Sequence, residues 1–163
     1  SGKSTLAIAL ERELYNSGIL CRILDGDNIR TGINNNLGFT ETDRVENIRR
    51  IAEVAKLFVD CGVVTIAAFI SPTEQIRQMA ADIIGKDDFF EIYVNTPLEI
   101  CEERDVKGLY KKARQGEIKN FTGISAPFEA PLNPAITIDT SACSLEESVN
   151  LLKKIIIPQI KPI

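Results

Sequence analysis

The first five residues of the chain, Ser1-Gly2-Lys3-Ser4-Thr5, have the types and spacing that bind a phosphate group. Gly-Lys-Ser/Thr at the head of a helix is the second half of a phosphate-binding loop. In such a loop backbone N–H groups surround the phosphates, the lysine reaches their outer oxygens and a hydroxyl meets magnesium. The tripeptide alone is a weak signal, but strong helix formers follow it, which favours a phosphate site. The strand and first glycine of the motif do not precede it, so we expect residues 1–163 to be truncated within this loop.

A second polar group, Asp25-Gly26-Asp27-Asn28-Ile29-Arg30, directly follows a short apolar run. In parallel α/β sheets ligands bind beyond the carboxyl ends of the strands, so these carboxylates would face the phosphate loop. Two carboxylates there can hold magnesium-bound water and accept a proton from an attacking hydroxyl. The alternative is an Asp-Gly turn that caps a helix, which turn statistics favour when the segment is taken alone.

Basic residues gather in two further segments. Arg44 and Asn47 lie on one face of a predicted helix, near its start, and suit the binding of an anion. The segment from Lys107 to Lys119 is rich in bases, which next to a phosphate loop indicates a mobile lid that excludes water when it closes. In both segments the alternative is a solvated, charged helix face.

Two phenylalanines, Phe39 and Phe121, lie in polar or glycine-flanked loops. Phenylalanines exposed in such places can hold a flat base by stacking. The alternative is that both rings are buried in the core, as phenylalanine side chains commonly are.

The pattern of apolar residues predicts the elements that must position these groups. Short apolar runs alternate with segments of helical period, which is typical of an α/β fold with a largely parallel sheet. No repeat or linker divides the sequence, so we expect a single domain. The predicted strands are 20–24, 63–70, 90–94 and 135–138, and the predicted helices are 5–16, 41–61, 74–84, 97–104 and 145–157. We expect strand 63–70 to be covered on both faces. The predicted apolar face of helix 41–61 consists of Val45, Ile48, Ala52, Ala55 and Val59.

Composition excludes several classes of function. Acids outnumber bases by 23 to 19, a net charge of −4, which argues against a protein that coats nucleic acid. Histidine is absent, which excludes histidine-based triads and histidine metal sites. No apolar run approaches the roughly 20 residues of a membrane helix, and no basic segment leads into a signal-peptide core. We therefore expect a cytoplasmic protein with no membrane or nucleic-acid partner.

The four cysteines, Cys21, Cys61, Cys101 and Cys143, form no C-x-x-C pair. This spacing argues against a zinc or iron–sulfur site. We expect the cysteines to be small buried hydrophobic residues in a reducing compartment.

Three stretches closely resemble the adenylyl-sulfate kinase family: LDGDNIRTGINNNLGFTETDRVENIRRIAEVAKLFVDCG, FISP and EIYVNTPLEICEERDVKGLYKKARQGEIKNFTGI. The resemblance covers nearly the whole chain. It implies a P-loop kinase fold of three αβα layers around a mainly parallel five-stranded sheet, whose first strand would precede Ser1. It also implies transfer of the γ-phosphoryl group of ATP, with Mg²⁺, to the 3′-hydroxyl of adenosine 5′-phosphosulfate (APS). A homodimer and an upstream sulfurylase partner or fused domain are compatible with it, and the sequence leaves both open.

The resemblance also assigns roles to single residues. The residues that match the ATP site are Gly2, Lys3, Ser4, Thr5 and Arg104. The residues that match the magnesium ligands are Ser4 and Asp25. The residues that match the catalytic positions are Lys3, Asp25 and Ser71. Those matching the APS pocket are Asp27, Asn28, Arg30, Phe39, Arg44, Asn47, Ile70 (through its backbone), Lys107 and Phe121. Ser71 matches a serine proposed in the family as a phosphoenzyme intermediate. Without histidine to activate that hydroxyl, we expect direct transfer and a positional role for Ser71.

Two departures from the family pattern concern the pocket. Thr31 stands where many members have histidine, and 73–77 reads Thr-Glu-Gln-Ile-Arg where many have an aromatic and an Arg/Asp-rich segment.

The alternatives to an adenylyl-sulfate kinase are a P-loop kinase of another small nucleotide, or a nucleotide-binding module whose catalysis has lapsed. Lys3, Ser4, Asp25 and Arg44 argue against the lapsed module, because each is a residue that phosphoryl transfer needs.

Overall fold

The computed structural model describes residues 1–160, apart from the side chain of Asp27. Its helices are α1 (Lys3–Asn16), α2 (Gly26–Arg30), α3 (Glu41–Asp60), α4 (Glu74–Ile84), α5 (Leu98–Arg104), α6 (Leu109–Arg114) and α7 (Leu145–Ile156), followed by a 3₁₀ turn, η1 (Ile157–Gln159). Its strands are β1 (Cys21–Asp25), β2 (Val64–Ala68), β3 (Ile92–Val94) and β4 (Ile136–Ile138). No helix in residues 1–160 is long and apolar enough to cross a membrane.

The strands form two parallel pairs, as the pattern predicts. β1 pairs with β2, with Asp25 opposite Ala68, and β3 pairs with β4, with Ile92 opposite Ile136. No hydrogen bonds between strands join the two pairs within residues 1–160. The α/β fold and the four predicted strands are thus confirmed. The prediction for strand 63–70 was wrong in two respects. The strand β2 is shorter, and Ala67 is exposed, because β2 borders an open groove on the side away from β1.

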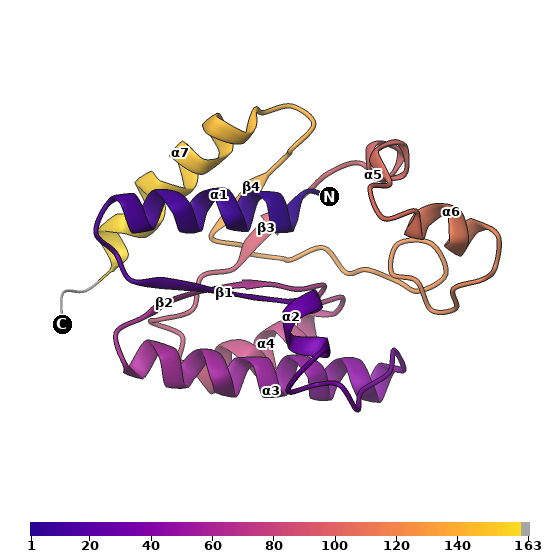
Figure 1. The fold of residues 1–163 in the computed structure, drawn as a ribbon, viewed down its shortest axis with the longest axis horizontal. Helices are drawn as coiled ribbons and strands as arrows, with labels where there is room; N and C mark the ends of the chain where they lie inside the picture. Colours follow the sequence, from indigo (N-terminus) through magenta and orange to yellow (C-terminus); the bar gives the residue numbers. More distant parts are fainter. Residues whose placement is uncertain (161–163) are drawn as a thin grey trace.

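Helices cover both faces of the strands (Figure 1). On one face α1 and α7 enclose a core that includes Leu14 and Leu152, which are 0% and 1% exposed. On the other face α3 and α4 enclose a second core that includes Ile48, Ala52 and Ala55. The predicted apolar face of α3 is therefore confirmed at these three positions. Alanines at the contact let two helices approach closely, and α4 packs along α3.

The carboxyl ends of the strands point toward one end of the molecule (Figure 1). The start of α1, helix α2 and the segment holding α5 and α6 all lie at this end. This is the edge where parallel α/β sheets bind their ligands. The fold therefore brings the predicted phosphate loop and the predicted lid to the same place.

The cysteines only partly match the prediction. Cys101 is buried and Cys21 is half-buried, but Cys61 and Cys143 are exposed. Cys61 lies where the chain turns after α3, and Cys143 lies in the loop that leads into α7. The prediction was wrong at these two positions because turns at helix ends have no second layer packed over them.

Candidate active site

The head of α1 is fixed at the carboxyl edge of the strands. Gly2 has the left-handed φ of 85° that favours glycine, and its carbonyl accepts the first helical bond, from Leu6 N at 2.9 Å. The carbonyl of Ser1 accepts hydrogen bonds from Thr96 Oγ1 at 3.0 Å and Thr140 Oγ1 at 3.1 Å. The first turn of α1 contains no acidic residue. Its N–H groups and the positive end of its dipole therefore remain suited to an anion.

Arg104 adds a positive charge beside this loop. It stands in the last turn of α5, and its two terminal nitrogens donate to Thr140 Oγ1 at 2.8 Å and Thr140 O at 2.9 Å. Because Thr140 also holds Ser1, one threonine connects the arginine to the head of α1.

A groove of about 1460 Å³ collects many of the predicted site residues. It runs between β2 and β3 and reaches the start of α1, the end of β2 and the segment after α5. The predicted residues that line it are Gly2, Lys3, Ser4, Thr5, Ile70, Ser71, Arg104, Lys107 and Phe121. The remaining predicted residues lie at the end of β1, on α2, in the following loop and on the first turns of α3.

Asp25 and Asn28 hold one another at the end of β1. Asp25 N donates to Asn28 Oδ1 at 3.1 Å, and Asn28 N donates to Asp25 Oδ1 at 3.3 Å. Asp25 therefore caps the short helix α2, as the turn interpretation expects, and it also stands at the carboxyl end of a strand. Its register partner Ala68 precedes Ile70 by two positions, so Asp25 lies at the same edge as the loop of Ile70. Asp27 belongs to α2, and its side chain lies outside the described part.

Arg30 supports the ring of Phe39. Its Nη1 donates to the carbonyls of Leu37 at 3.2 Å and Gly38 at 3.1 Å. Its guanidinium carbon lies 4.4 Å from the centre of the Phe39 ring, within the range of a cation–π contact. Phe39 is nevertheless 60% exposed, so much of the ring remains accessible to a ligand.

Arg44 joins the loop of Phe39 to the segment of Phe121. Its Nε donates to Phe39 O at 3.2 Å, its Nη1 to Thr122 Oγ1 at 3.2 Å and its Nη2 to Asn120 O at 2.6 Å. One guanidinium group thus holds the backbone of Phe39 and the two neighbours of Phe121, which are far apart in sequence.

Phe121 is itself half-buried against the predicted lid. Its ring meets the ring of Tyr110 on α6 edge to face, with 5.1 Å between the centroids. Burial, and then the neighbouring Cys101, raise the pKa of the Tyr110 phenol to about 12. The phenol therefore stays protonated, and Tyr110 serves as a neutral packing surface for Phe121.

Arg30 and Arg44 concentrate positive charge next to these rings. Their hydrogen bonds within the described part go to carbonyl and hydroxyl oxygens. Burial, and then the like charge of Arg30, lower the pKa of Arg44. Two neighbouring guanidinium groups bonded to neutral acceptors favour the binding of an anion between them.

Asn47 lies three positions beyond Arg44 on α3 and is only 5% exposed. Its amide oxygen accepts a hydrogen bond from Asn34 Nδ2 at 3.0 Å. Arg44 and Asn47 therefore share one side of the helix, as their spacing predicts.

The loop of Ile70 and Ser71 is held from behind by Arg77. Arg77 Nη1 donates to Ser71 O at 2.8 Å, and the same buried guanidinium pairs with Glu74 and Glu91, both at 2.8 Å. Arg77 is the arginine that the chain keeps in the segment that departs from the family pattern. In this structure it anchors the loop through the backbone and leaves the Ser71 side chain on the groove.

Sequence reasoning missed Thr96, Thr140 and Asn34. Thr96 and Thr140 each lie two positions beyond the end of a predicted strand, so the rule that parallel sheets bind ligands at their carboxyl edge could have found them. Asn34 lies in a loop, and no local pattern indicates that its side chain is buried.

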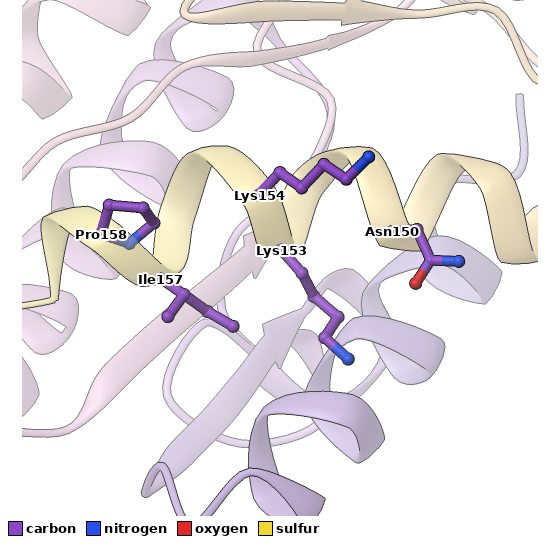
Figure 2. A pocket seen from close by; sticks show the side chains of 5 residues that line it. All are labelled: Asn150, Lys153, Lys154, Ile157 and Pro158. Carbon is purple, nitrogen blue, oxygen red and sulfur yellow. The ribbon is translucent and has the colours of Figure 1, made fainter.

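A second pocket, of about 460 Å³, lies on α7 (Figure 2). It is lined by Asn150, Lys153, Lys154, Ile157 and Pro158, none of them a predicted site residue. Lys153 Nζ lies 2.7 Å from Glu13 Oε2, so its charge is already paired. The pocket therefore adds nothing to the site at the strand ends.

Comparisons with known proteins point to one family. The family model described as "Adenylylsulphate kinase" matches residues 1–139. An adenylyl-sulfate kinase of Bacteroides fragilis is 75% identical over 160 residues, which are 98% of this chain and 79% of that protein. One of Clostridium kluyveri is 57% identical over 92% of this chain and 75% of its own length. Among solved structures, the APS kinase CysC of Mycobacterium tuberculosis in complex with AMPPNP and APS has a TM-score of 0.92 at 43% identity. The similarity covers 96% of this chain and 91% of that one.

The family model matches most of the chain, and both relatives are more than 50% identical over more than nine tenths of it. The chain belongs to the adenylylsulphate kinase family.

Proposed function

We propose that this site transfers the γ-phosphoryl group of ATP to the 3′-hydroxyl of APS, giving 3′-phosphoadenosine 5′-phosphosulfate and ADP. The observation that carries the proposal is the pair Arg30 and Arg44. Within the described part both guanidinium groups bond to neutral oxygens, and that of Arg30 lies over the largely exposed ring of Phe39. A ligand with a flat base and an anionic group satisfies both features, and an adenosine phosphosulfate has both.

In this proposal the head of α1 binds the phosphates of ATP. The N–H groups after Gly2 meet the phosphate oxygens, together with the Ser4 and Thr5 hydroxyls. Lys3 neutralises the charge that develops on the transferred group, and Arg104 adds a second cation from α5. Phosphoryl transfer depends mainly on such positioning and electrostatic stabilisation, so these groups account for much of the rate.

The residues present also fit a magnesium ion carried by ATP. Ser4 and Asp25 offer a hydroxyl and a carboxylate oxygen, the hard ligands that Mg²⁺ takes. The described residues contain no cluster of three or more His, Cys, Asp or Glu side chains, which agrees with a metal held chiefly by phosphates and water. When bound, the ion would neutralise charge on the phosphates.

The APS pocket extends from α2 to the segment after α5. We assign the adenine to the space between Phe39 and Phe121, and the phosphosulfate to Arg30, Arg44 and Lys107. Asp27, Asn28, Asn47 and the backbone of Ile70 complete the pocket. Because Arg44 bonds to the segments of both phenylalanines, we assign it the role of holding the two rings on either side of one adenine.

Asp25 stands where the acceptor hydroxyl of APS would meet the γ-phosphate. Its carboxylate takes the proton of the 3′-hydroxyl as the new O–P bond forms and the bond to ADP breaks. Ser71 lies on the groove with its carbonyl fixed by Arg77, and we assign it a positional role in direct transfer.

We expect Phe39→Ala and Phe121→Ala each to weaken APS binding by about 1–3 kcal/mol, the range for stacking a base on an aromatic ring. Neither change should alter the affinity for ATP by more than about twofold. Isothermal titration with each nucleotide measures both effects. Tyr15→Ala is the control, because Tyr15 is an exposed ring near the C-terminal end of α1 and does not line the groove. Equal weakening of both nucleotides would assign the two rings to the packing of the lid.

We also propose that a fifth strand fills the groove between β2 and β3, supplied by a segment ahead of Ser1. The groove is lined by residues of both strands and by apolar residues of the flanking helices, such as Leu10 and Ile51. Thr96 and Thr140 hold the carbonyl of Ser1 at the carboxyl end of the strands. A parallel strand in the groove would end at that point and continue into α1, which gives a strand–loop–helix unit at the phosphate site.

A form extended by roughly 15–30 upstream residues, enough for a strand and its lead-in, tests this proposal. Compared with residues 1–163 alone, we expect the melting temperature to rise by about 10 °C, equivalent to roughly 3 kcal/mol for a domain of this size. ATP-dependent product formation should appear with it. Proline in the middle of the added strand should remove both gains, because it cannot pair with β2 and β3. Equal stability and activity of the two forms would contradict the proposal.

The function is tested with the full-length protein, MgATP and either APS or AMP as acceptor. We expect ADP and the 3′-phosphorylated product to form in equal amounts from APS, and at least about 100-fold less efficient turnover of AMP, which lacks the sulfate that Arg30 and Arg44 would bind. A preference for AMP would make the protein a kinase of another small nucleotide. If the protein bound ATP and either acceptor without turnover, it would be a nucleotide-binding module whose catalysis has lapsed.

A further inference from the structure

Asn34, in the loop between α2 and α3, has a fully buried side chain with 0% exposure. Its backbone N donates to Ile29 O at 3.0 Å, which ties the loop to the end of α2. Its side-chain Nδ2 donates to Asn47 Oδ1 at 3.0 Å and to Asn47 O at 3.4 Å. A fully buried amide in a loop is costly unless it is hydrogen-bonded, and here its nitrogen bonds to a residue of the proposed APS pocket.

Arg50 determines which way the Asn34 amide points. Its Nη1 donates to Asn34 Oδ1 at 3.4 Å and to Asn36 Oδ1 at 2.9 Å. Glu46 holds the same guanidinium, with 2.7 Å between Arg50 Nε and Glu46 Oε1. Arginine has donors only, so it selects the oxygen of Asn34 and turns the nitrogen toward Asn47.

The same logic then fixes the amide of Asn47. Because Asn34 presents a donor, Asn47 must turn its oxygen toward Asn34, and its own Nδ2 points the other way. The hydrogen bonds from Arg50 to Asn34 and from Asn34 to Asn47 therefore determine which group of the Asn47 amide faces a ligand. That group is the N–H₂ donor.

We propose that Asn34 is a positioning residue that holds the Asn47 amide with its N–H₂ group toward APS. The pocket then recognises a hydrogen-bond acceptor at this point, either a ring nitrogen or an anionic oxygen of the nucleotide. The inference deepens the proposed function, because it rests on the proposed contact between Asn47 and APS. It adds a specificity determinant that does not itself touch the ligand.

A double-mutant cycle in the full-length protein separates this role from a structural one. We expect Asn34→Ala to raise KM for APS about tenfold, as for the loss of one buried hydrogen bond, with kcat and KM for ATP within about twofold of the parent. In an Asn47→Ala background, Asn34→Ala should raise KM for APS less than twofold further. Asn36→Ala is the matched control, since Asn36 contacts the same nitrogen of Arg50 without reaching Asn47. It should leave all three constants unchanged.

Asn34→Asp is the second variant, because it keeps the shape of the side chain and faces Arg50, which can pair its charge. It lacks the donor to Asn47, so we expect it to raise KM for APS as Asn34→Ala does. In the Asn47→Ala background it should raise KM for APS less than twofold further. Equal effects of the Asn34 changes in both backgrounds would overturn the proposal, and so would failure of both Asn34 variants to unfold cooperatively on heating. If Asn47→Ala alone left KM for APS unchanged, the proposed role of Asn47 would be at fault instead.

Discussion

Lys3→Ala is expected to lower kcat/KM by at least about 10²-fold, or roughly 3 kcal/mol of transition-state stabilisation, the range for loss of one donor to developing charge. The lysine begins α1, next to the glycine whose left-handed conformation opens the loop. Its ammonium group is expected to meet the oxygens of the transferred phosphoryl group, whose charge must be neutralised as the bond to ADP breaks. Steady-state kinetics with ATP and APS in the full-length protein measure the effect.

Lys154→Ala is the matched control for this prediction. Lys154 is an exposed lysine on α7 (Figure 2) that does not line the groove at the head of α1, and its removal changes the net charge by the same amount. We expect it to keep the kinetics of the parent. Turnover of Lys3→Ala close to that of the parent would show that Lys3 does not stabilise the transferred group.

Asp25→Asn is expected to lower kcat by about 10²-fold or more with little change in KM for either substrate. Asparagine keeps an oxygen that can accept the N–H of Asn28, so the cap of α2 survives. It cannot take the proton of the acceptor hydroxyl, and it carries no charge for a magnesium ion. The loss should therefore appear in the chemical step and not in binding.

Asp82→Asn, on the exposed side of α4, provides the control for Asp25→Asn. It should behave like the parent in both kcat and KM. A large rise in KM for APS with normal kcat in Asp25→Asn would place Asp25 among the residues that recognise the substrate.

The long helices and the positions of the strands along the chain could be predicted because their signals are local. The apolar face of α3 repeats with helical period, and the predicted bounds of α4 match those of the structure. The short helix α2 was expected only in the alternative interpretation, in which Asp25-Gly26 is a turn that caps a helix. It depends on a reciprocal bond between Asp25 and Asn28 that appears only once β1 has fixed their backbone. The strands β2, β3 and β4 are shorter than their predicted apolar runs, because pairing, and not hydrophobicity, defines the length of a strand.

Residues of the candidate site could be predicted from short motifs, but the contacts between its distant segments could not. The phosphate loop is readable because its residues are contiguous. By contrast, Arg44 bonds Asn120 and Thr122, which are 76 and 78 positions away, and no pattern in the sequence reveals such a contact. The same holds for Asn34, which is polar and in a loop, yet is fully buried because Asn47 and Arg50 satisfy its amide.

The most direct test of the proposed site is a crystal structure of the full-length protein with AMPPNP and APS. We predict the adenine of APS between Phe39 and Phe121, with ring centroids about 4.5–7 Å apart as in stacked aromatic pairs. The triphosphate should meet the N–H groups at the start of α1 and the Lys3 side chain, and Asn47 Nδ2 should donate to APS. APS bound away from Arg30 and Arg44, or a triphosphate that does not reach the head of α1, would contradict the account.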